Sequence, residues 1–486
     1  MSTPAQVMPI ESARSDIERV FRLQQAFAPS LRATTAKERI AKIRKLRDAV
    51  QANAEQIYLA AAADYGKPSA EVDLAELMPI VAEANHTMSN LKKWMKPRRV
   101  PAIRSMLGTS SYIKSEPRGV CLIISPWNYP VNLAFVPVIS AIAAGNTAIV
   151  KPSEMAPQLS ALIARIIREN FDPREVAAFE GDARVATELL EQPFDHIFFT
   201  GSPQLGKVIM AAAAKHLSSI TLELGGKSPT IVDASADLKM TARSVLWAKY
   251  TNAGQTCIAP DYVMVPEEKL EAFMQAAEKI LPTRFPKVVD NPDYTRIVNG
   301  RFYERLVGMI EEARTKGARV LQSNPANENC NADNRVIPPT LVANTDESMK
   351  IMQEEIFGPI LPVITYRELD DAIRYVNDRP RPLALYYFDR DSTRIARVLN
   401  ETTSGGATIN DCIFHLPQHN LPFGGVGPSG MGAYHGFDGF ATFSKKKGVF
   451  IQGFGGQFLF PRFLSPPYGR ITDWLIRFLI RNPKSD

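Results

Sequence analysis

The sequence predicts an α/β protein with two domains. From residue 118 onward, short apolar runs alternate with amphipathic stretches, as strands alternate with helices around a parallel sheet. The 486 residues also exceed the length that one hydrophobic core usually supports. With 45% hydrophobic residues, 22% charged residues and no low-complexity tract, the chain is expected to be folded and globular.

The first half of the chain predicts a helical start followed by a doubly wound sheet. Residues 36–64 carry apolar residues at helical spacing, so roughly the first 90 residues are predicted to be helical. Residues 91–104 hold two prolines and six basic residues, which indicates a solvated connector. Buried strands and amphipathic helices are then expected in alternation, with strands within 118–130, 146–154, 194–202 and 219–224 and helices at 156–170 and 203–217.

The second half predicts another α/β stretch, from about residue 226 to 425. Its expected helices lie at 236–250, 266–280 and 392–400, and its clearest expected strands lie at 362–366 and 384–388. No internal repeat of solenoid length is visible in the sequence.

Charge and cysteine content exclude several classes of protein. The formal charge of +6 is a small excess over this length and does not indicate nucleic-acid binding. The four cysteines form neither a C-x-x-C motif nor a disulfide framework, and no metal site is predicted. No signal peptide and no run of 18 apolar residues is visible, so a cytoplasmic protein with free thiols is expected.

Cys257 is the first candidate catalytic residue. It stands alone among small and polar residues, in the sequence TNAGQTCIAP at 251–260. A thiolate is a nucleophile without a histidine if backbone amides or a local dipole lower its pKa. None of the six histidines lies near Cys257 in sequence, but this does not exclude a Cys–His hydrolase.

Glu223 and Asn128 each allow a catalytic and a structural interpretation. Glu223 interrupts an apolar strand just before two glycines, so burial would raise its pKa toward the range of a general base. It could instead cap the glycine loop. Asn128 follows another predicted central strand, where its amide could donate to an oxyanion. It could instead close a proline-bounded turn, and on local sequence alone that is the favoured interpretation.

Two further stretches suggest a nucleotide site. Lys151 ends a predicted buried strand and Glu154 follows, where a parallel sheet binds nucleotides and where this pair could hold the ribose hydroxyls of adenosine. A solvated lysine and a helix-start glutamate are the alternative. Gly201, Ser202 and Gly206 lie in a strand–helix turn that could admit a phosphate, although a plain turn also requires glycine.

Seven motifs, in order between about 118 and 445, resemble the aldehyde dehydrogenase superfamily. They are PWNYP, KPSE, FTGS, LELGGKSP, NAGQTCIAP, EEIFGP and LPFGGVGPSGMGAYHG. The flanking residues resemble the class 3 branch, which includes coniferyl-aldehyde and fatty-aldehyde dehydrogenases. The stretch from 414 to 436 is most similar to the bacterial coniferyl-aldehyde type.

The resemblance implies a role for each candidate residue. Cys257 would attack the aldehyde, Asn128 and the Cys257 N–H would hold the oxyanion, and Glu223 would activate the water that hydrolyses the thioester. The cofactor, NAD with NADP as the alternative, would be held by Lys151 and Glu154 at the adenosine ribose. Its remaining contacts would be Gly201, Ser202 and Gly206 at the pyrophosphate, Glu355 and Phe357 at the nicotinamide, and Trp127 as a wall of the pocket.

The resemblance also implies the architecture: a Rossmann-type NAD(P)-binding domain, an α/β catalytic domain and a small β oligomerisation element. Their expected ranges are 1–98 with 118–224, then 225–430, then 99–117 with 431–450, before an amphipathic tail at 451–486. The residues SYIKSEP within 111–117 alternate like an exposed strand that could pair with another subunit, so a homodimer is expected.

Two features qualify the expected chemistry. Many superfamily members carry a lysine nine residues after the oxyanion asparagine, whereas this chain has Pro137, which removes one proposed proton-relay partner. Glu154 should repel a 2′-phosphate and favour NAD, although class 3 relatives often accept both cofactors.

The tail leaves two alternatives. Its apolar residues Ile471, Trp474, Leu475, Phe478 and Leu479 follow helical spacing, accompanied by basic Arg470, Arg477, Arg481 and Lys484. Such a helix could contact an anionic membrane surface. Packing on its own body or on a partner subunit is favoured.

The predicted function is NAD(P)-dependent oxidation of an aromatic or a medium- to long-chain aldehyde. The rivals are a cofactor-independent cysteine hydrolase and a catalytically idle structural protein on the same fold.

Overall fold

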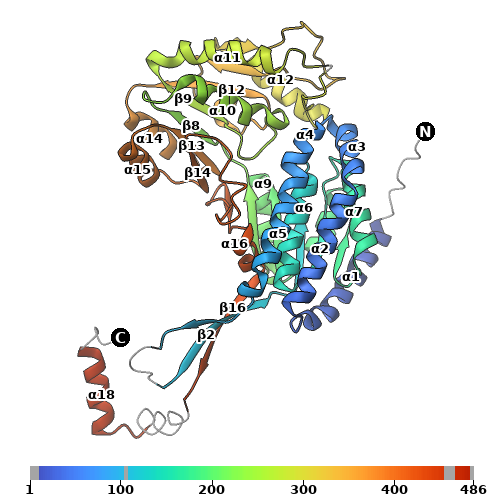
Figure 1. The fold of residues 1–486 in the computed structure, drawn as a ribbon, viewed down its shortest axis with the longest axis vertical. Helices are drawn as coiled ribbons and strands as arrows, with labels where there is room; N and C mark the ends of the chain where they lie inside the picture. The colour runs from blue at the N-terminus through green and yellow to red at the C-terminus, as the bar shows by residue number, and fades with distance from the viewer. Residues whose placement is uncertain (1–9, 103–107, 290, 454–465, 482–486) are drawn as a thin grey trace.

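Two α/β bodies and a narrow projecting sheet make up the molecule. The computed structural model describes residues 10–102, 108–289, 291–453 and 466–481. In Figure 1 the first half of the chain forms most of one body, the stretch from β8 to β14 (residues 229–409) forms the other, and β2 and β16 project away from both. The expected division into two α/β stretches is therefore seen in the ribbon.

The first body contains a six-stranded sheet in the order β15-β7-β6-β3-β4-β5. Five strands are parallel, namely β3 (Val120–Ile124), β4 (Thr147–Lys151), β5 (Val176–Ala178), β6 (His196–Gly201) and β7 (Ser219–Leu224), while β15 (Gly430–Met431) is antiparallel to β7. The chain runs from β3 outward to β4 and β5 and then returns to β6 on the other side of β3. The topological switch point therefore lies between β3 and β6, which is where such sheets bind ligands.

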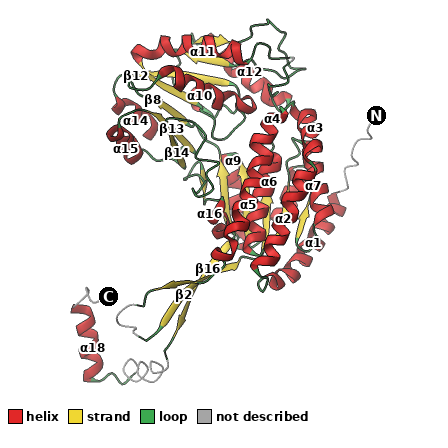
Figure 2. Cartoon of the chain, in the orientation of Figure 1, coloured by secondary structure: helices red, strands yellow, loops and turns green. Residues whose placement is uncertain are grey.

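Helices cover both faces of this sheet, as Figure 2 shows. On β3, Cys121 and Ile123 enter the core formed with α2, α5, α6 and α7, while Leu122 and Ile124 enter the core formed with α1, α8 and α9. Alternate side chains of a strand face opposite sides, so a strand buried on both faces is apolar throughout. The helices are α1 (Ile10–Leu31), α2 (Ala36–Ala52), α3 (Ala54–Tyr65), α4 (Ser69–Val72), the π-helix η1 (Asp73–Leu77), α5 (Met78–Trp94), α6 (Pro130–Ala144), α7 (Pro157–Asn170), α8 (Ala183–Leu190) and α9 (Pro203–His216).

The predicted helical stretch 36–64 forms two helices, α2 and α3. Asn53 separates them, and its side-chain Nδ2 donates to the carbonyl oxygen of Ala49 at 2.8 Å, which satisfies one terminal acceptor of α2. Periodicity alone does not locate such a break, because the apolar spacing continues across it.

The second body contains a seven-stranded sheet in the order β10-β11-β12-β9-β8-β13-β14. Its strands are β8 (Pro229–Val232), β9 (Tyr262–Pro266), β10 (Arg319–Gln322), β11 (Thr340–Ala343), β12 (Ile360–Tyr366), β13 (Ala384–Phe388) and β14 (Gly406–Ile409), and only β10 pairs in antiparallel fashion. Its helices are η3 (Thr251–Gly254), η4 (Glu267–Lys269), α10 (Leu238–Tyr250), α11 (Leu270–Arg284), α12 (Gly300–Thr315), α13 (Lys350–Gln353), α14 (Leu369–Asn377) and α15 (Ser392–Glu401). The strands and helices expected here are confirmed, except that α11 begins four residues later than expected.

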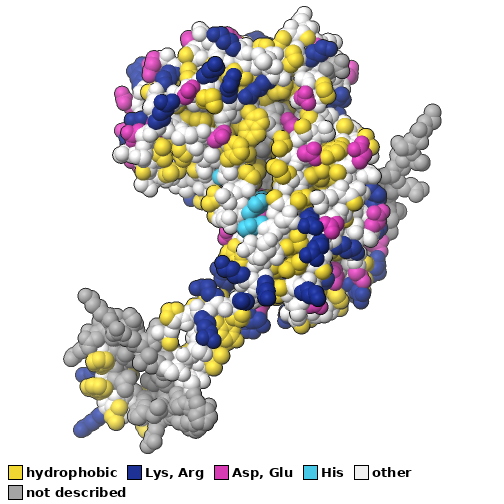
Figure 3. All heavy atoms as spheres, viewed as in Figure 1, with side chains coloured by type: hydrophobic (Ala, Val, Ile, Leu, Met, Phe, Trp, Pro, Cys, Tyr) yellow, Lys and Arg dark blue, Asp and Glu magenta, His cyan; other side chains and the backbone are white. Residues whose placement is uncertain are grey.

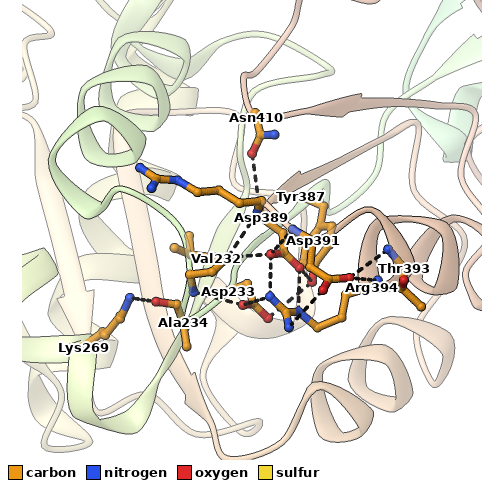
Figure 4. A network of polar contacts seen from close by, with 12 residues as sticks. Val232, Asp233, Ala234, Lys269, Tyr387, Asp389, Asp391, Thr393, Arg394 and Asn410 are labelled. Carbon is orange, nitrogen blue, oxygen red and sulfur yellow. Dashed lines mark hydrogen bonds and ion pairs between the residues drawn. The ribbon is translucent and has the colours of Figure 1, made fainter.

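A polar network joins the carboxyl ends of β8 and β13 (Figure 4). The carboxylate of Asp389 accepts two bonds from the Arg394 guanidinium, both at 2.8 Å, and further bonds from the hydroxyls of Tyr387 and Ser235. These bonds hold the pKa of Asp389 well below its usual range, although burial opposes them. A fully bonded charge at this position fixes the start of α15 against the sheet.

The projecting sheet consists of β1 (Arg98–Val100), β2 (Ser110–Pro117) and β16 (Ser444–Ile451). The expectation that β2 offers its edge to another subunit is wrong for the side that β16 occupies, because β16 pairs with β2 along its whole length. β1 covers part of the other side, at residues 111–113. The basic stretch before β2 is exposed in the described residues, and Lys and Arg side chains gather where this sheet leaves the body (Figure 3).

The last elements are α16 (Gly436–Thr442) and α18 (Arg470–Arg481). α16 packs against α5 and α6 of the first body. α18 stands apart from both bodies in Figure 1, and its Ile471, Trp474 and Phe478 side chains are exposed. Of the favoured expectation, packing on its own body is therefore not what the ribbon shows, while packing on a partner subunit stays a prediction. The Leu475 and Leu479 side chains, Arg481's side chain and Lys484 lie outside the described residues. In the part of the chain that is described, no helix combines the length and apolar character needed to cross a membrane.

Candidate active site

The loop before Cys257 has an unusual backbone that explains its small residues. Asn252 and Ala253 adopt positive φ angles of 53° and 50°, and Gly254 follows at 73°. A Cβ atom on Gly254 would lie 2.3 Å from the carbonyl oxygen of Gly358, so glycine is required there. The Asn252 side chain donates to the backbone oxygen of Asn128 at 3.1 Å. The sequence around Cys257 is therefore shaped by a tight turn that connects to the loop of Asn128.

The Cys257 thiol is partly buried and surrounded by carboxyl groups. Burial, followed by the charges of Glu355 and Glu223, raises its pKa to about 12, and the backbone N–H groups of Cys257 and Ile258 oppose this rise. In the resting protein Cys257 is therefore a protonated thiol. Cys257 has no disulfide partner, as expected. A proton must leave the sulfur before it can act as a nucleophile.

Glu223 lies on β7, paired with Gly430 of β15 and with Thr200 of β6. Both of its carboxylate oxygens are buried and lack a hydrogen-bond partner. Burial therefore raises the pKa of Glu223 well above its usual value. Glu223 does not cap the glycine loop, which was the structural interpretation of its position. An unpartnered carboxyl group beside a thiol is chemically available to a substrate or a water molecule.

Asn128 follows β3 and faces the cysteine loop. Its Nδ2 atom donates to the carbonyl oxygen of Gln255 at 3.0 Å, which orients the amide and leaves its second N–H free to donate elsewhere. Next to it, the hydroxyl of Tyr129 lies 2.6 Å from that of Thr256. The Asn128 side chain thus bonds to the catalytic loop rather than closing a local turn. The structure brings Cys257, Glu223 and Asn128 to one place.

A buried ion pair supports Asn128, and sequence reasoning missed it. Lys67 Nζ lies 3.2 Å from Glu76 Oε1 and 3.1 Å from the backbone oxygen of Asn128. Both charged side chains are fully buried. Glu71, which is half-buried, accepts from the backbone N–H of Asn252 at 2.9 Å. These residues lie in a stretch with no recognisable motif, and only their charge within a helical region could have drawn attention to them.

The residues expected at the adenosine ribose lie together at the carboxyl end of β4. Lys151 Nζ is 2.6 Å from Glu154 Oε2. The lysine is buried, while the Glu154 side chain is 42% exposed and can meet a ligand from solvent. The interpretation of Lys151 as a solvated surface lysine is therefore wrong.

The turn expected at the pyrophosphate joins β6 to α9. Ser202 is the N-cap of α9, and its Oγ accepts from the N–H of Leu205. A Cβ atom on Gly206 would lie 2.9 Å from a methyl group of Leu224, so this glycine allows α9 to approach β7 closely. A Cβ atom on Gly201 would meet the ring of Phe199 at 2.5 Å. The turn thus presents a helix N-terminus, with the partial positive charge of its dipole, at the carboxyl edge of the sheet.

Three aromatic rings and Glu355 border the thiol. The ring centroid of Trp127 lies 5.4 Å from those of Phe357 and Phe302, and Phe302 is a residue that sequence reasoning missed. A Cβ atom on Gly225 would fall 2.1 Å from Glu355 Oε2, so the carboxyl group of Glu355 lies directly on this glycine. Burial, then the charge of Asp261, raises the pKa of Glu355 to about 8.

The arrangement fits a dinucleotide cofactor. Trp127 follows β3, and Lys151 and Gly201 are the last residues of β4 and β6, so all three lie at the carboxyl edge of the first sheet, at or beside its switch point. Pro137 is buried within α6, so the position nine residues after Asn128 offers no titratable group. Among the described residues, no histidine forms a hydrogen bond to Cys257, so a Cys–His pair is not seen.

Comparison with known proteins gives the family. The model of the aldehyde dehydrogenase family matches residues 5–449. A probable coniferyl aldehyde dehydrogenase of Caulobacter vibrioides is 45% identical, over 92% of this chain and 93% of its own length. Mouse aldehyde dehydrogenase family 3 member A2 is 40% identical, over 95% and 94%.

Solved structures agree with these matches. The substrate-bound state of Staphylococcus aureus AldH has a TM-score of 0.89 at 39% identity, and the match covers 95% of this chain and 99% of that one. Aldehyde dehydrogenases solved as NAD⁺ complexes match at 26% identity, with TM-scores of 0.81 and 0.82. By its sequence, its fold and the convergence of Cys257, Glu223 and Asn128, this chain belongs to the aldehyde dehydrogenase family, in its class 3-like branch.

Proposed function

We propose that Cys257, Glu223 and Asn128 carry out NAD(P)-dependent oxidation of an aldehyde to its carboxylic acid in this chain. The observation that carries these roles is the unpartnered, buried carboxyl group of Glu223, whose charge acts on the Cys257 thiol. A protein that needed Glu223 only for packing would gain stability from an apolar side chain at this position, because an unpaired buried carboxyl group is unfavourable.

Cys257 forms the bond to the substrate. The thiol loses its proton to solvent, and the thiolate adds to the aldehyde carbon to give a thiohemiacetal, whose oxyanion is stabilised by the Asn128 Nδ2 and Cys257 backbone N–H groups. Bound NAD(P)⁺ would supply the acceptor for the hydride that this carbon gives up. The product on Cys257 is a thioester, and sulfur leaves it readily.

Glu223 then releases the acid. Because burial raises its pKa, the Glu223 carboxylate is a stronger base than an ordinary glutamate; it takes a proton from water as the water oxygen attacks the thioester carbonyl. The C–S bond breaks, the carboxylic acid leaves, and Cys257 is restored.

The remaining site residues hold the cofactor. Lys151 and Glu154 hold the adenosine ribose, and Gly201, Ser202 and Gly206 admit the pyrophosphate at the N-terminus of α9. Glu355, Phe357 and Trp127 surround the nicotinamide. The exposed carboxylate of Glu154 disfavours a 2′-phosphate, so NAD is the preferred cofactor and NADP the weaker alternative.

The proposed substrate is an aromatic aldehyde such as coniferaldehyde, or a medium- to long-chain alkanal. The rings of Trp127, Phe302 and Phe357 support an apolar substrate. Because two relatives are named for coniferyl aldehyde, we rank aromatic aldehydes first among the proposed substrates.

We further propose the domain assignment 1–98 with 118–224 for NAD(P) binding, 225–430 for catalysis, and 99–117 with 431–450 for oligomerisation. A homodimer follows from the projecting three-stranded sheet, whose outer strand edges are exposed to a partner subunit. The four unpaired cysteines support a cytoplasmic location.

For the tail 451–486 we propose contact with a partner subunit, since the described apolar side chains of α18 are exposed within one chain. Peripheral contact with an anionic membrane surface is the alternative. Co-sedimentation with anionic liposomes, for the full chain and for a version that ends at Pro466, separates the two, because equal binding removes the membrane alternative.

The experiment for the central proposal follows NADH absorbance while the protein is mixed with NAD and a panel of aldehydes. Steady NADH formation with coniferaldehyde or with alkanals supports the proposal and ranks the substrates. Protein that binds NAD but yields no NADH with any aldehyde contradicts it. Ester cleavage without NADH would instead favour the hydrolase.

A further inference from the structure

A second cluster of reactive side chains lies where α5 meets the segment before α16. Glu83 is on α5, His419 lies in the loop after β14, and His435 directly precedes α16. Glu83 Oε2 lies 3.0 Å from His419 Nδ1 and 3.7 Å from His435 Nδ1. One ligand atom from each of the three side chains lies within 4.8 Å of the other two.

His435 is the unexplained member of this cluster. The residue is 4% exposed, and neither of its ring nitrogens has a hydrogen-bond partner. A buried imidazole without partners is unfavourable, because it has lost its bonds to water without replacement. The ring nitrogen nearest Glu83, in its unprotonated form, offers a lone pair to which a metal ion could bind.

Hydrogen bonds to one oxygen of the Glu83 carboxylate hold it in place, while its other oxygen lies nearest the two imidazoles. Its Oε1 atom accepts from the backbone N–H of Gly436 at 2.8 Å and from the Thr87 hydroxyl at 3.4 Å. Oε2 is left to face the two imidazoles. Such a second layer of hydrogen bonds, which orients a ligand from its far side, is typical of metal sites.

The distances suit a small transition-metal ion. Zinc binds histidine nitrogen and carboxylate oxygen at about 2.0–2.2 Å, which places tetrahedral ligand atoms about 3.3 Å apart. The separations of 3.0 and 3.7 Å lie on either side of this value. Two imidazoles and one carboxylate favour zinc over calcium or magnesium, because those ions prefer oxygen ligands. The His419 side chain is 19% exposed, so an ion and a fourth, water ligand can reach the site.

We propose that Glu83, His419 and His435 form a binding site for one Zn²⁺ or chemically similar ion. The site shares no residue with Cys257, Glu223 and Asn128, and it does not depend on the proposed catalytic roles. By joining α5 to residues 419–436, which are 336 or more positions later in the chain, the ion clamps the last part of the first body onto its helical layer.

The test uses the full-length Cys257→Ala protein, because the Cys257 thiol could itself bind zinc. After chelator treatment and dialysis, titration calorimetry with Zn²⁺ is expected to show one ion per chain. Glu83→Gln and His419→Asn, each made in this background, are expected to lower the affinity at least about tenfold, since each removes one of three ligands. His216→Asn at the exposed end of α9 is the matched control and should leave the affinity unchanged.

A second measurement guards against a variant that fails to fold. Anomalous scattering at the zinc edge, from crystals of the Cys257→Ala protein with Zn²⁺, should place one peak between the three side chains. No binding by the Cys257→Ala protein, unchanged affinity in both ligand variants, or a peak elsewhere would overturn the proposal. The cluster would then be a hydrogen-bonded carboxylate and imidazole group only.

Discussion

The Nζ atom of Lys67 donates to the backbone carbonyl oxygen of Asn128 at 3.1 Å. The same oxygen accepts from Asn252 of the cysteine loop, so one carbonyl group links the oxyanion asparagine to the turn before Cys257. Lys67 is held by Glu76 at 3.2 Å, and both charges are buried. The loops of Asn128 and Cys257 are therefore positioned by a buried ion pair.

Lys67→Met together with Glu76→Gln is expected to lower kcat about tenfold and to leave KM for NAD nearly unchanged. The double variant removes the donor to Asn128 but avoids an unpaired buried carboxylate. Steady-state NADH kinetics measure this split. Lys67→Met alone should also lose roughly 3–5 kcal/mol of folding stability, because Glu76 is left without its partner. A double variant with unchanged kcat would mean that the pair serves stability alone.

Glu223→Gln is expected to give a single burst of NADH and then to stop, because only the release of the thioester requires the base. Rapid mixing with excess aldehyde measures a burst of about one NADH per active chain. Cys257→Ala, the control, should give neither a burst nor turnover. If Glu223→Gln gave no burst, Glu223 would also be required before hydride transfer.

The steady-state rate should rise with pH if release of the acid limits turnover. Burial raises the pKa of Glu223, so its catalytic, deprotonated form is lost as pH falls through this raised value. A pH profile of kcat under saturating substrates is expected to fall on its acidic side. The burst rate of Glu223→Gln should lack that same inflection.

Alkylation of the resting protein should report the state of Cys257. Its pKa of about 12 means that the thiolate fraction grows about tenfold per pH unit across the accessible range. Glu355→Gln should speed iodoacetamide labelling at pH 9, since Glu355, with a pKa of about 8, is charged there and raises the pKa of the thiol. At pH 7 the effect should nearly vanish. Peptide mass spectrometry follows the label, and equal rates at pH 9 would contradict the arrangement.

Gly225→Ala is expected to raise KM for NAD at least about tenfold. The added Cβ would displace the Glu355 carboxyl group from a position only 2.1 Å away. Gly226→Ala is the matched control, because its Cβ would meet its nearest neighbour at an ordinary 3.5 Å. Equal effects of the two substitutions would show that the close contact with Glu355 is not what matters.

Asp389→Asn should destabilise the second body by about 2–4 kcal/mol, since it weakens the fully buried end of the network in Figure 4. Thermal denaturation measures the loss. Asp370→Asn, at an exposed pair with Arg397, is the control and should have little effect. The stabilisation from Asp389 is present above the carboxyl pKa of the unfolded chain and is lost as pH falls through its lower folded value.

Much of the fold could be predicted because apolar runs and helical spacing are local signals. Strands such as β4 and β6 lie where the alternation of apolar runs with amphipathic stretches predicts them. The contacts of Lys67, Phe302 and His435 could not be predicted, because they join segments far apart in sequence through packing. The break between α2 and α3 at Asn53 and the position of β2 in the middle of its sheet could not be predicted either. A hydrogen bond of the Asn53 side chain accompanies the break, and pairing with β16, which is distant in sequence, places β2 in the middle.

The pairing of β15 with β7 affects the order in which the first sheet can form during protein synthesis. Glu223 is made near the midpoint of the chain, but Gly430, which lies beside it in the sheet, leaves the ribosome only after most of the remaining chain. Until then one edge of β7 lacks its neighbouring strand. A nascent or prematurely ended chain can therefore fold much of the first sheet while the strand that carries Glu223 is still an open edge.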